Sequence, residues 1–451
     1  MINGGLLAFG GKRVLLLQGP LGPFFRRLAA DLTQAGAVVH KVNFNGGDWL
    51  FSPGAHSIAF KGRSEAWPAF FENLLDRLKI DVVLLFGDCR RYHREAHAIA
   101  TERGLDIGVF EEGHLRPDWI TLERFGVNGH SLIPKNPRFY WNLPPKPPSG
   151  QEARVDKAFR MTALWAVVYY LAASLLRPLF PHYRHHRPLT LLEALPWIRA
   201  GWRKFYFAIK ERGVLDKLVG EKSKRYFLVP LQVHNDAQVC VHSPYADVSE
   251  FIEEVVASFA THAPARTMLV IKHHPRDRGY HDYSARIREL SRRFGLDGRL
   301  IYVHDLHLPT LLNHASGAVL INSTVGLSAL HHNVPTKTTG SAFYDISGLT
   351  YQGGLDEFWT KAWAASPNRE LFRRFRDYLQ SNMLINGSFY RRLPGSRLKS
   401  GILWSGDGEW LPSKPLDDTQ DALRMAKARR TPYSAGPGPA KDHWAKPAST
   451  R

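Results

Sequence analysis

The sequence predicts an α/β protein in which two Rossmann-like domains face a cleft, with a helical, basic and aromatic insertion between them. Two stretches of the chain each alternate short apolar runs with segments of helical spacing. A Pro-rich segment, NLPPKPPSGQ (142–151), follows the first stretch. With 451 residues, the chain is long enough for at least two domains at roughly 100–200 residues each.

The first stretch predicts an N-terminal domain over residues 1–150. Strands are expected at 13–17 (RVLLL), 38–43, 81–86 (DVVLLF) and 107–110, and helices at 24–34 and 92–102. Strands that alternate with helices indicate a parallel, doubly wound sheet. Ligands of such sheets bind outside the carboxyl ends of the strands.

The middle of the chain, residues 151–220, is expected to form a helical insertion. Residues 161–176 (MTALWAVVYYLAASLL) carry no charge, but the run is shorter than the roughly 20 residues of a spanning helix. Two interpretations stay open: a helix at a bilayer interface, which the basic flanks and aromatic residues suit, and a helix buried between domains. Residues 195–210 mix aromatic and basic side chains, which favours the interfacial interpretation.

Alternation resumes in a second domain, predicted over residues 221–365. It predicts strands at 226–230, 268–272, 300–303 and 318–321, and helices at 247–261, 284–294, 309–314 and 325–331. Two such domains around a cleft form the GT-B architecture of many sugar-nucleotide glycosyltransferases. Residues 366–399 predict a C-terminal helical segment, and the polar, Gly/Pro-rich residues 400–451 predict a disordered tail.

Composition limits the partners. The net charge of +19 favours nucleic acid, an acidic membrane surface or phosphorylated substrates. No nucleic-acid-binding motif accompanies this charge, so no nucleic acid is expected. Cys89 and Cys240, the two cysteines, form neither a disulfide framework nor a zinc spacing, which favours a reducing cytoplasm. The sequence has no D-x-D triplet, P-loop or G-x-S-x-G elbow, so no metal and no cofactor are predicted.

Candidate site residues follow strands in both domains. Glu111 and Glu112 come directly after the strand at 107–110, where a ligand is expected. Asp236 follows the first strand of the second domain, although a turn or helix cap alone would explain it. Lys272 and His274 leave the strand at 268–272, where the ordinary alternative is a solvated basic loop.

The turn of Asn322, Ser323 and Thr324 lies between a predicted strand and a predicted helix. Ser and Thr are expected helix N-caps. The same geometry points backbone N–H groups and the positive end of the helix dipole at the cleft, which suits an anion. The two interpretations are compatible.

Together these segments resemble the KpsS/LipB-type family of capsule polysaccharide synthesis and export proteins of Gram-negative bacteria. The resembling segments, in order over 105–359, are EEGHLRPDWITLE with GVN, PLQVHNDAQ with SPY, IKHHPRDRG, and INSTVGLSALHHNVPTKTTGSAFYDISGLT with LDEFW. The sequence departs from the family pattern at His114, where an aromatic residue such as Tyr is expected. Related two-domain Kdo transferases carry Asp in place of Glu112.

The resemblance implies a retaining β-Kdo glycosyltransferase, where Kdo is 3-deoxy-D-manno-octulosonic acid. CMP-Kdo would be the donor, and phosphatidylglycerol or its lyso form the acceptor that starts the poly-Kdo linker. The protein would be cytoplasmic, peripheral on the anionic inner-membrane surface, and associated with other capsule synthesis and export proteins. Two alternatives stay open: a non-enzymatic component of the export machinery and a GT-B sugar-nucleotide epimerase.

The residue types allow a mechanism for such a reaction. Lys272, His274 and the turn at 322–324 suit the donor phosphate. Two carboxylates explain retention by double displacement, in which Asp236 attacks the anomeric carbon and Glu112 deprotonates the acceptor hydroxyl. Exchanged roles, or Glu111 in place of Glu112, are equally compatible with the sequence.

Overall fold

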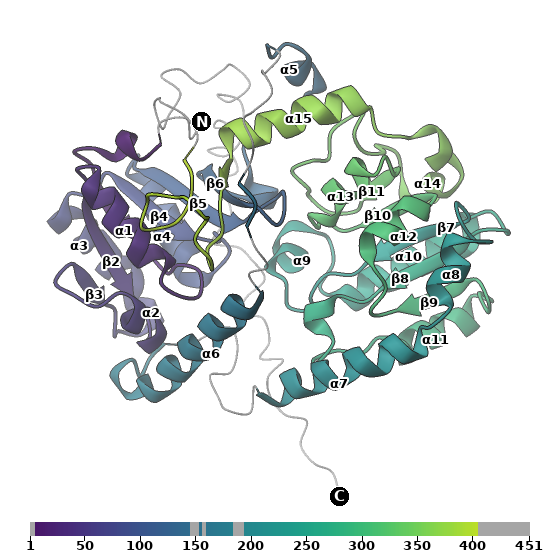
Figure 1. The fold of residues 1–451 in the computed structure, drawn as a ribbon, viewed down its shortest axis with the longest axis horizontal. Coiled ribbons are helices and arrows are strands. Elements are labelled where there is room, and N and C mark those ends of the chain that lie inside the picture. Colours follow the sequence, from purple (N-terminus) through teal and green to yellow (C-terminus); the bar gives the residue numbers. More distant parts are fainter. Residues whose placement is uncertain (1–4, 145–152, 156–158, 184–193, 405–451) are drawn as a thin grey trace, which may run out of the picture.

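A computed structural model describes residues 5–144, 153–155, 159–183 and 194–404 of the chain. Most of the Pro-rich segment and the predicted tail from residue 405 onward lie outside the described residues. Figure 1 shows two α/β halves side by side, each built around its own sheet. This arrangement confirms the predicted fold of two Rossmann-like domains with a GT-B-like architecture, whereas the predicted domain boundaries stay predictions.

The first half contains a seven-stranded sheet in the order β12-β6-β5-β4-β1-β2-β3. Its strands are β1 (Arg13–Leu16), β2 (Val38–Asn43), β3 (Ser57–Ala59), β4 (Val82–Phe86), β5 (Asp106–Glu112), β6 (Trp119–Arg124) and β12 (Leu384–Asn386). β1 to β5 are parallel, but β6 runs antiparallel to β5, and β12 antiparallel to β6. The expectation of a purely parallel sheet is wrong at this edge, because the short loop 113–118 can close a hairpin but cannot hold a parallel crossover.

Helices cover both faces of this sheet. They are α1 (Phe24–Gln34), α2 (Gly46–Phe51), α3 (Trp67–Leu78) and α4 (Arg91–Glu102), and α5 (Pro137–Trp141) follows the sheet's hairpin in the chain. α1 and α4 confirm the two predicted helices. One face of the sheet packs around Phe24, Phe110 and Phe389, and the other around Trp67 and Phe71. These apolar layers hold β4 and β5 rigidly, and both strands lead into the site.

The second half contains a five-stranded, fully parallel sheet in the order β11-β10-β7-β8-β9. Its strands are β7 (Tyr226–Pro230), β8 (Met268–Lys272), β9 (Leu300–Val303), β10 (Gly317–Leu320) and β11 (Thr336–Thr338). Its helices are α8 (Val214–Val219), α9 (Ala237–His242), α10 (Val248–His262), α11 (Ser284–Arg293), α12 (Leu308–His314), α13 (Val325–His331) and α14 (Leu355–Lys361). The predicted strands and helices of this half are confirmed, with shifts of one residue at some ends.

The chain returns to the first half near its C-terminal end. α15 (Arg369–Asn382) crosses from one half to the other, and β12 then extends the first sheet (Figure 1). One apolar cluster joins the halves on this side, since it contains Tyr140 together with Phe343 and Phe375. His114, the departure from the family pattern, stacks on Phe343 with ring centroids 4.0 Å apart. It therefore occupies an aromatic position in this interface.

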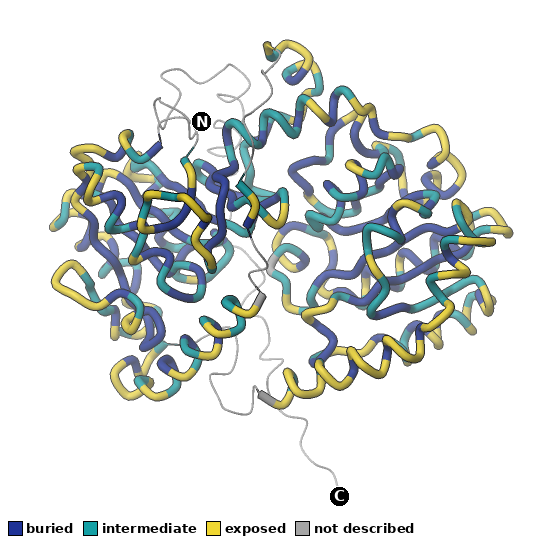
Figure 2. The backbone as a smooth tube through the Cα atoms, in the orientation of Figure 1, coloured by how far each residue is buried: buried dark blue, intermediate teal, exposed yellow. Residues whose placement is uncertain are grey.

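The helical insertion divides between the two halves. α6 (Phe159–Leu175) packs on α2, where a Cβ at Gly47 would lie 2.7 Å from the Tyr169 ring. α7 (Ala194–Lys210) packs on the second half through Arg203 and Phe207, which are both buried. Exposed residues line the outer sides of both helices along the lower edge of Figure 2.

One side of α6 is buried and the other is exposed. Tyr169 and Ala173 are buried against the first half, whereas Leu171 and Leu175 are 42% and 77% exposed. Within the described ranges, no helix is long and apolar enough to cross a membrane.

Candidate functional site

Glu111 and Glu112 are the last two residues of β5, which is longer than the predicted strand at 107–110. The Glu112 backbone N–H donates to Glu111 Oε1 at 2.9 Å. Burial raises the pKa of Glu111 to about 7, and the negative charges of Glu112 and Asp88 act in the same direction. A carboxyl group with this pKa can both take up and release a proton near neutral pH.

Tyr390 is a site residue that the sequence did not indicate. It lies beyond β12, and its hydroxyl donates to Glu112 Oε1 at 2.7 Å. Burial and the neighbouring Glu112 raise the Tyr390 pKa far above its usual value, so the hydroxyl keeps its proton and stays a donor. The return of the chain to the first sheet therefore fixes the orientation of the Glu112 carboxylate.

Asp236 is the N-cap of α9. Its Oδ1 accepts from the Gln238 backbone N–H at 2.9 Å, and its Oδ2 accepts a longer bond of 3.4 Å from Gln232 Nε2. Burial raises the pKa of Asp236, while these hydrogen bonds and the charges of Arg116 and Arg276 lower it. Arg116 belongs to the β5–β6 loop, so a cation of the first half acts on a carboxylate of the second.

His274 also caps its own loop. Its Nδ1 accepts from the Arg276 backbone N–H at 3.2 Å, which leaves the proton of the neutral ring on Nε2. Burial and the charge of Arg276 lower the His274 pKa to about 4, so the ring is neutral at pH 7. His274 can therefore donate a hydrogen bond to an anion without carrying a charge of its own.

Lys272 is buried at the end of β8, and its Nζ donates to the His304 carbonyl at 3.3 Å. Burial lowers the Lys272 pKa to about 8, against the charges of Asp305 and Glu211 that raise it. The ammonium group is therefore turned toward the β9 side of the sheet. It supplies positive charge close to the His274 loop.

The turn at 322–324 is held mainly by protein contacts. Asn322 Nδ2 donates to the carbonyls of Gln238 and His242, and its Oδ1 accepts from Gln232 Nε2 at 3.1 Å. Ser323 Oγ accepts from the Val325 backbone N–H at 3.2 Å, whereas the Thr324 side chain makes no cap bond to α13. Asn322 thus orients the loop that carries Asp236.

Residues 81–390 match the family model described as "Capsule polysaccharide biosynthesis protein". The chain belongs to this family. It is 44% identical over 383 residues to the capsule polysaccharide export protein KpsS of Escherichia coli, covering 84% of this chain and 97% of that protein. It is 42% identical over 392 residues to the capsule polysaccharide modification protein LipB of Neisseria meningitidis serogroup A, covering 85% and 92%.

A solved structure, the β-Kdo 2,7 transferase of Thermosulfurimonas dismutans KpsC, is also similar. It is 16% identical, with a TM-score of 0.37, over 78% of this chain and 90% of that chain.

In this capsule family member, the charge of Arg276 affects a residue in each half of the site. The charge of Arg276 acts on Asp236 and on Tyr390, whose hydroxyl contacts Glu112. Two pairs of predicted residues thus lie on different halves, Glu111 with Glu112 and Asp236 with Asn322. Lys272 and His274 lie at the end of β8 and just beyond it. The motif IKHHPRDRG contains Arg276, so its basic composition was the available signal for this residue.

Proposed function

We propose that this protein is a retaining β-Kdo glycosyltransferase that moves Kdo from CMP-Kdo to a phosphatidylglycerol-type lipid. The observation that carries the proposal is the placement of carboxyl groups on both halves, Glu111 and Glu112 on β5 and Asp236 before α9, with the charge of Arg276 acting on Asp236 and on the Tyr390 hydroxyl that contacts Glu112. Membership of the capsule family and the motif resemblance support the choice of substrates.

In the first step, Asp236 attacks the anomeric carbon of Kdo. The new bond forms as the bond from that carbon to the CMP phosphate oxygen breaks, and CMP leaves with the electron pair. His274 donates from Nε2 to the departing phosphate, and Arg276 adds positive charge. The backbone N–H groups beside Ser323 and Thr324, and the charge of Lys272, stay predicted contributors to the same anion site.

In the second step, the acceptor hydroxyl attacks the same carbon and displaces Asp236. Its proton passes to a carboxylate of β5. The pKa of about 7 favours Glu111 as this base, because a base is most effective when its pKa is near the working pH. Glu112, held by Tyr390, then lies beside it as an oriented acceptor for the substrate hydroxyls.

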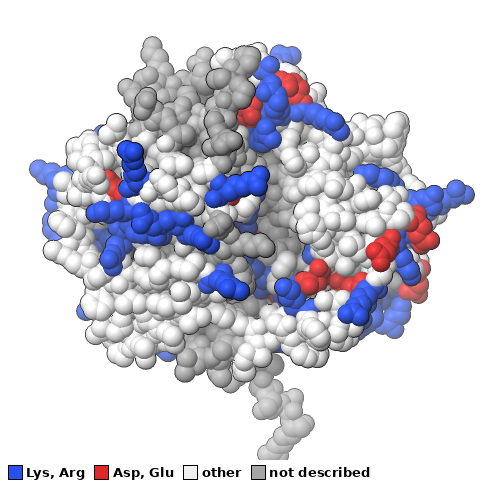
Figure 3. All heavy atoms as spheres, in the orientation of Figure 1, with Lys and Arg blue, Asp and Glu red and all other residues white. Residues whose placement is uncertain are grey.

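The exposed faces of α6 and α7 would contact the membrane that contains the acceptor lipid. Ile198, Trp202 and Phe205 on α7 are 68%, 65% and 70% exposed, and the basic residues Lys204 and Lys210 are exposed on the same helix. Aromatic and basic side chains together suit an anionic bilayer interface. In the view of Figure 3, Lys and Arg side chains also lie on both sides of the boundary between the halves.

The test is product formation by the purified chain given CMP-Kdo and a fluorescent phosphatidylglycerol or lysophosphatidylglycerol. We expect a lipid-linked Kdo with the β configuration, and none with a UDP-sugar donor. Absence of product, with intact CMP-Kdo and folded protein, would favour the non-enzymatic export component. Turnover of a UDP-sugar without lipid would favour the epimerase.

A further inference from the structure

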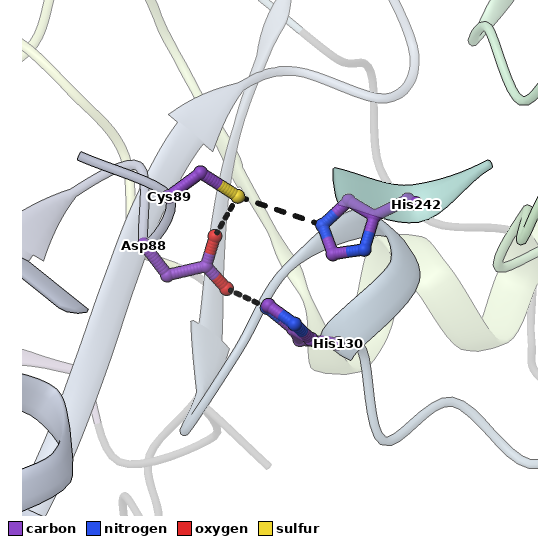
Figure 4. A group of neighbouring side chains, drawn as sticks. All are labelled: Asp88, Cys89, His130 and His242. Carbon is purple, nitrogen blue, oxygen red and sulfur yellow. Dashed lines mark hydrogen bonds and ion pairs between the residues drawn. The ribbon is translucent and has the colours of Figure 1, made fainter. Parts of the chain in front are cut away.

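Four side chains with metal-binding atoms meet where the two halves touch (Figure 4). Asp88 and Cys89 follow β4, His130 ends the short 3-10 helix Asn128–His130, and His242 ends α9 of the second half. One ligand atom from each lies within 4.8 Å of all the others. Residues of both halves thus converge on one point.

We propose that these four side chains bind one divalent cation of the zinc class, which clamps the two halves together. A thiolate, two imidazoles and a carboxylate are the ligand types that tetrahedral Zn²⁺ takes in proteins. Bonds of about 2.0–2.3 Å place neighbouring ligand atoms of a tetrahedral site about 3.3–3.8 Å apart. Cys89 Sγ lies 3.5 Å from His242 Nε2 and 3.3 Å from Asp88 Oδ1, so these pairs need little movement.

The surroundings of the cluster fit a cation. Asp88 is 1% exposed, and its one ion pair within the described ranges is with His130, at 3.0 Å. The Val127 backbone N–H donates to the same carboxylate at 3.2 Å and so fixes its orientation. Metal ligands in proteins are commonly oriented by such a hydrogen bond from a neighbouring group. A buried carboxylate gains from a bound positive charge beside it.

The backbone makes room for the ligand that comes from the second half. A Cβ at Gly129 would lie 2.4 Å from His242 Nδ1, so only glycine lets this imidazole approach. His242 Nε2, the other ring nitrogen, faces Cys89. The His130 and His242 rings lie 4.3 Å apart and nearly perpendicular, so they do not stack.

The proposed role is structural. Four protein ligands complete a tetrahedron and leave no open position for substrate, as in structural zinc sites. Because three ligands belong to the first half and one to the second, the cation would stabilise their present arrangement. The inference rests on this geometry alone and is independent of the proposed transferase activity.

The test uses the full chain, stripped of metal with a chelator and reloaded with Zn²⁺ or Co²⁺. We expect about one equivalent of zinc by mass spectrometry after desalting, and a thiolate-to-cobalt charge-transfer band in the Co²⁺ form. Both signals should be lost in Cys89→Ser and in His242→Ala. Cys240→Ser removes the other cysteine, which is exposed and outside the cluster, and should keep both.

Two outcomes would overturn the proposal. One is wild-type protein that retains no stoichiometric metal and shows no thiolate band. The other is Cys89→Ser protein that binds metal as the wild type does. Circular dichroism of the metal-free variants separates loss of a ligand from loss of the fold, and the wild-type cobalt spectrum decides the question even if a variant fails to fold.

Discussion

The two halves of the site hold their polar side chains in different ways. On β5, Glu111 and Glu112 belong to a paired strand, so the ladder fixes their backbone. Glu111 Oε1 also accepts the Glu112 backbone N–H, a bond that the amide oxygen of a glutamine would keep. In the second half, Asp236, His274 and Ser323 each accept the backbone N–H two residues further on. A substitution on β5 can therefore remove a reactive group and leave the backbone in place. In the second half, a substitution of a reactive side chain also changes the hydrogen bond that holds its loop.

The largest effect is expected for Asp236→Asn. Asparagine caps a helix about as well as aspartate, so α9 should keep its N-terminus, but the amide cannot act as the nucleophile. We expect the transfer rate to fall by at least about 10³-fold with an unchanged melting temperature. Asp236→Ala should lose the same activity and in addition about 1 kcal/mol of stability.

A matched cap elsewhere controls for this change. Asp247 caps α10 by accepting from the Ser249 and Glu250 backbone N–H groups at 2.7 and 3.0 Å. Asp247→Asn should therefore leave the transfer rate unchanged. If Asp236→Asn kept more than about a tenth of the wild-type rate, Asp236 would not be the nucleophile.

Glu111→Gln tests the first half. Loss of a general base should slow transfer by about 10²-fold. We expect kcat/KM for the acceptor to rise in the wild type as pH passes about 7, and the variant should lose this rise. An unchanged pH profile in the variant would assign the proton transfer to another group, with Glu112 the nearest candidate.

Glu111→Gln should also change stability in a pH-dependent way. Its folded pKa of about 7 is above the ordinary value of 4.5, so the folded state favours the protonated carboxyl group. The resulting contribution of Glu111 to the free energy of unfolding is fully present below pH 4.5 and is lost as pH rises through 7. The neutral amide avoids that loss. Denaturant unfolding should therefore find the variant more stable than the wild type at pH 8, by up to about 3 kcal/mol, and equally stable at pH 4.

The regular parts of the fold could be predicted because their apolar periodicity is local. α1, β2, β8 and α13 begin and end at the predicted residues. β6 and β12 were missed: β12 has three residues, too few for a period, and both depend on antiparallel partners that local patterns do not specify. The antiparallel edge also extends β5 through Glu112, whereas the predicted strand ends at residue 110.

The candidate site residues that the sequence indicated lie at or after strand ends, where ligands of parallel sheets bind. Glu111 is one of the last two residues of β5, and Asp236 and His274 follow β7 and β8 in the chain. Tyr390 contacts Glu112 across 278 positions of sequence, and Cys89 contacts His242 across 153. No spacing rule reaches that far, so these contacts follow only from the crossing of α15 and the packing of α9 against the first half.

The exposed face of α7 offers a prediction outside the candidate site. Trp202→Ser with Phe205→Ser removes two exposed aromatic side chains and should weaken flotation with anionic vesicles about 30-fold, a loss of about 2 kcal/mol. Trp363→Ser removes an 83% exposed tryptophan outside α6 and α7 and should have no effect. Equal binding to neutral and anionic vesicles would contradict the electrostatic part of the membrane proposal.

The smallest effect is expected for Tyr390→Phe. The hydroxyl donates to Glu112 Oε1, and a hydrogen bond to a charged group is worth about 1.5–3 kcal/mol, so we expect about a tenfold loss in transfer rate. Tyr351→Phe removes a similar bond to Glu357 at the surface and should change nothing. An unchanged rate in Tyr390→Phe would mean that Glu112 needs no positioning. The catalytic contribution of β5 would then depend on Glu111 alone. The contrast between the halves would become sharper, because the first half would contribute one strand residue. In the second half, Asp236 would still be both the helix cap and the nucleophile.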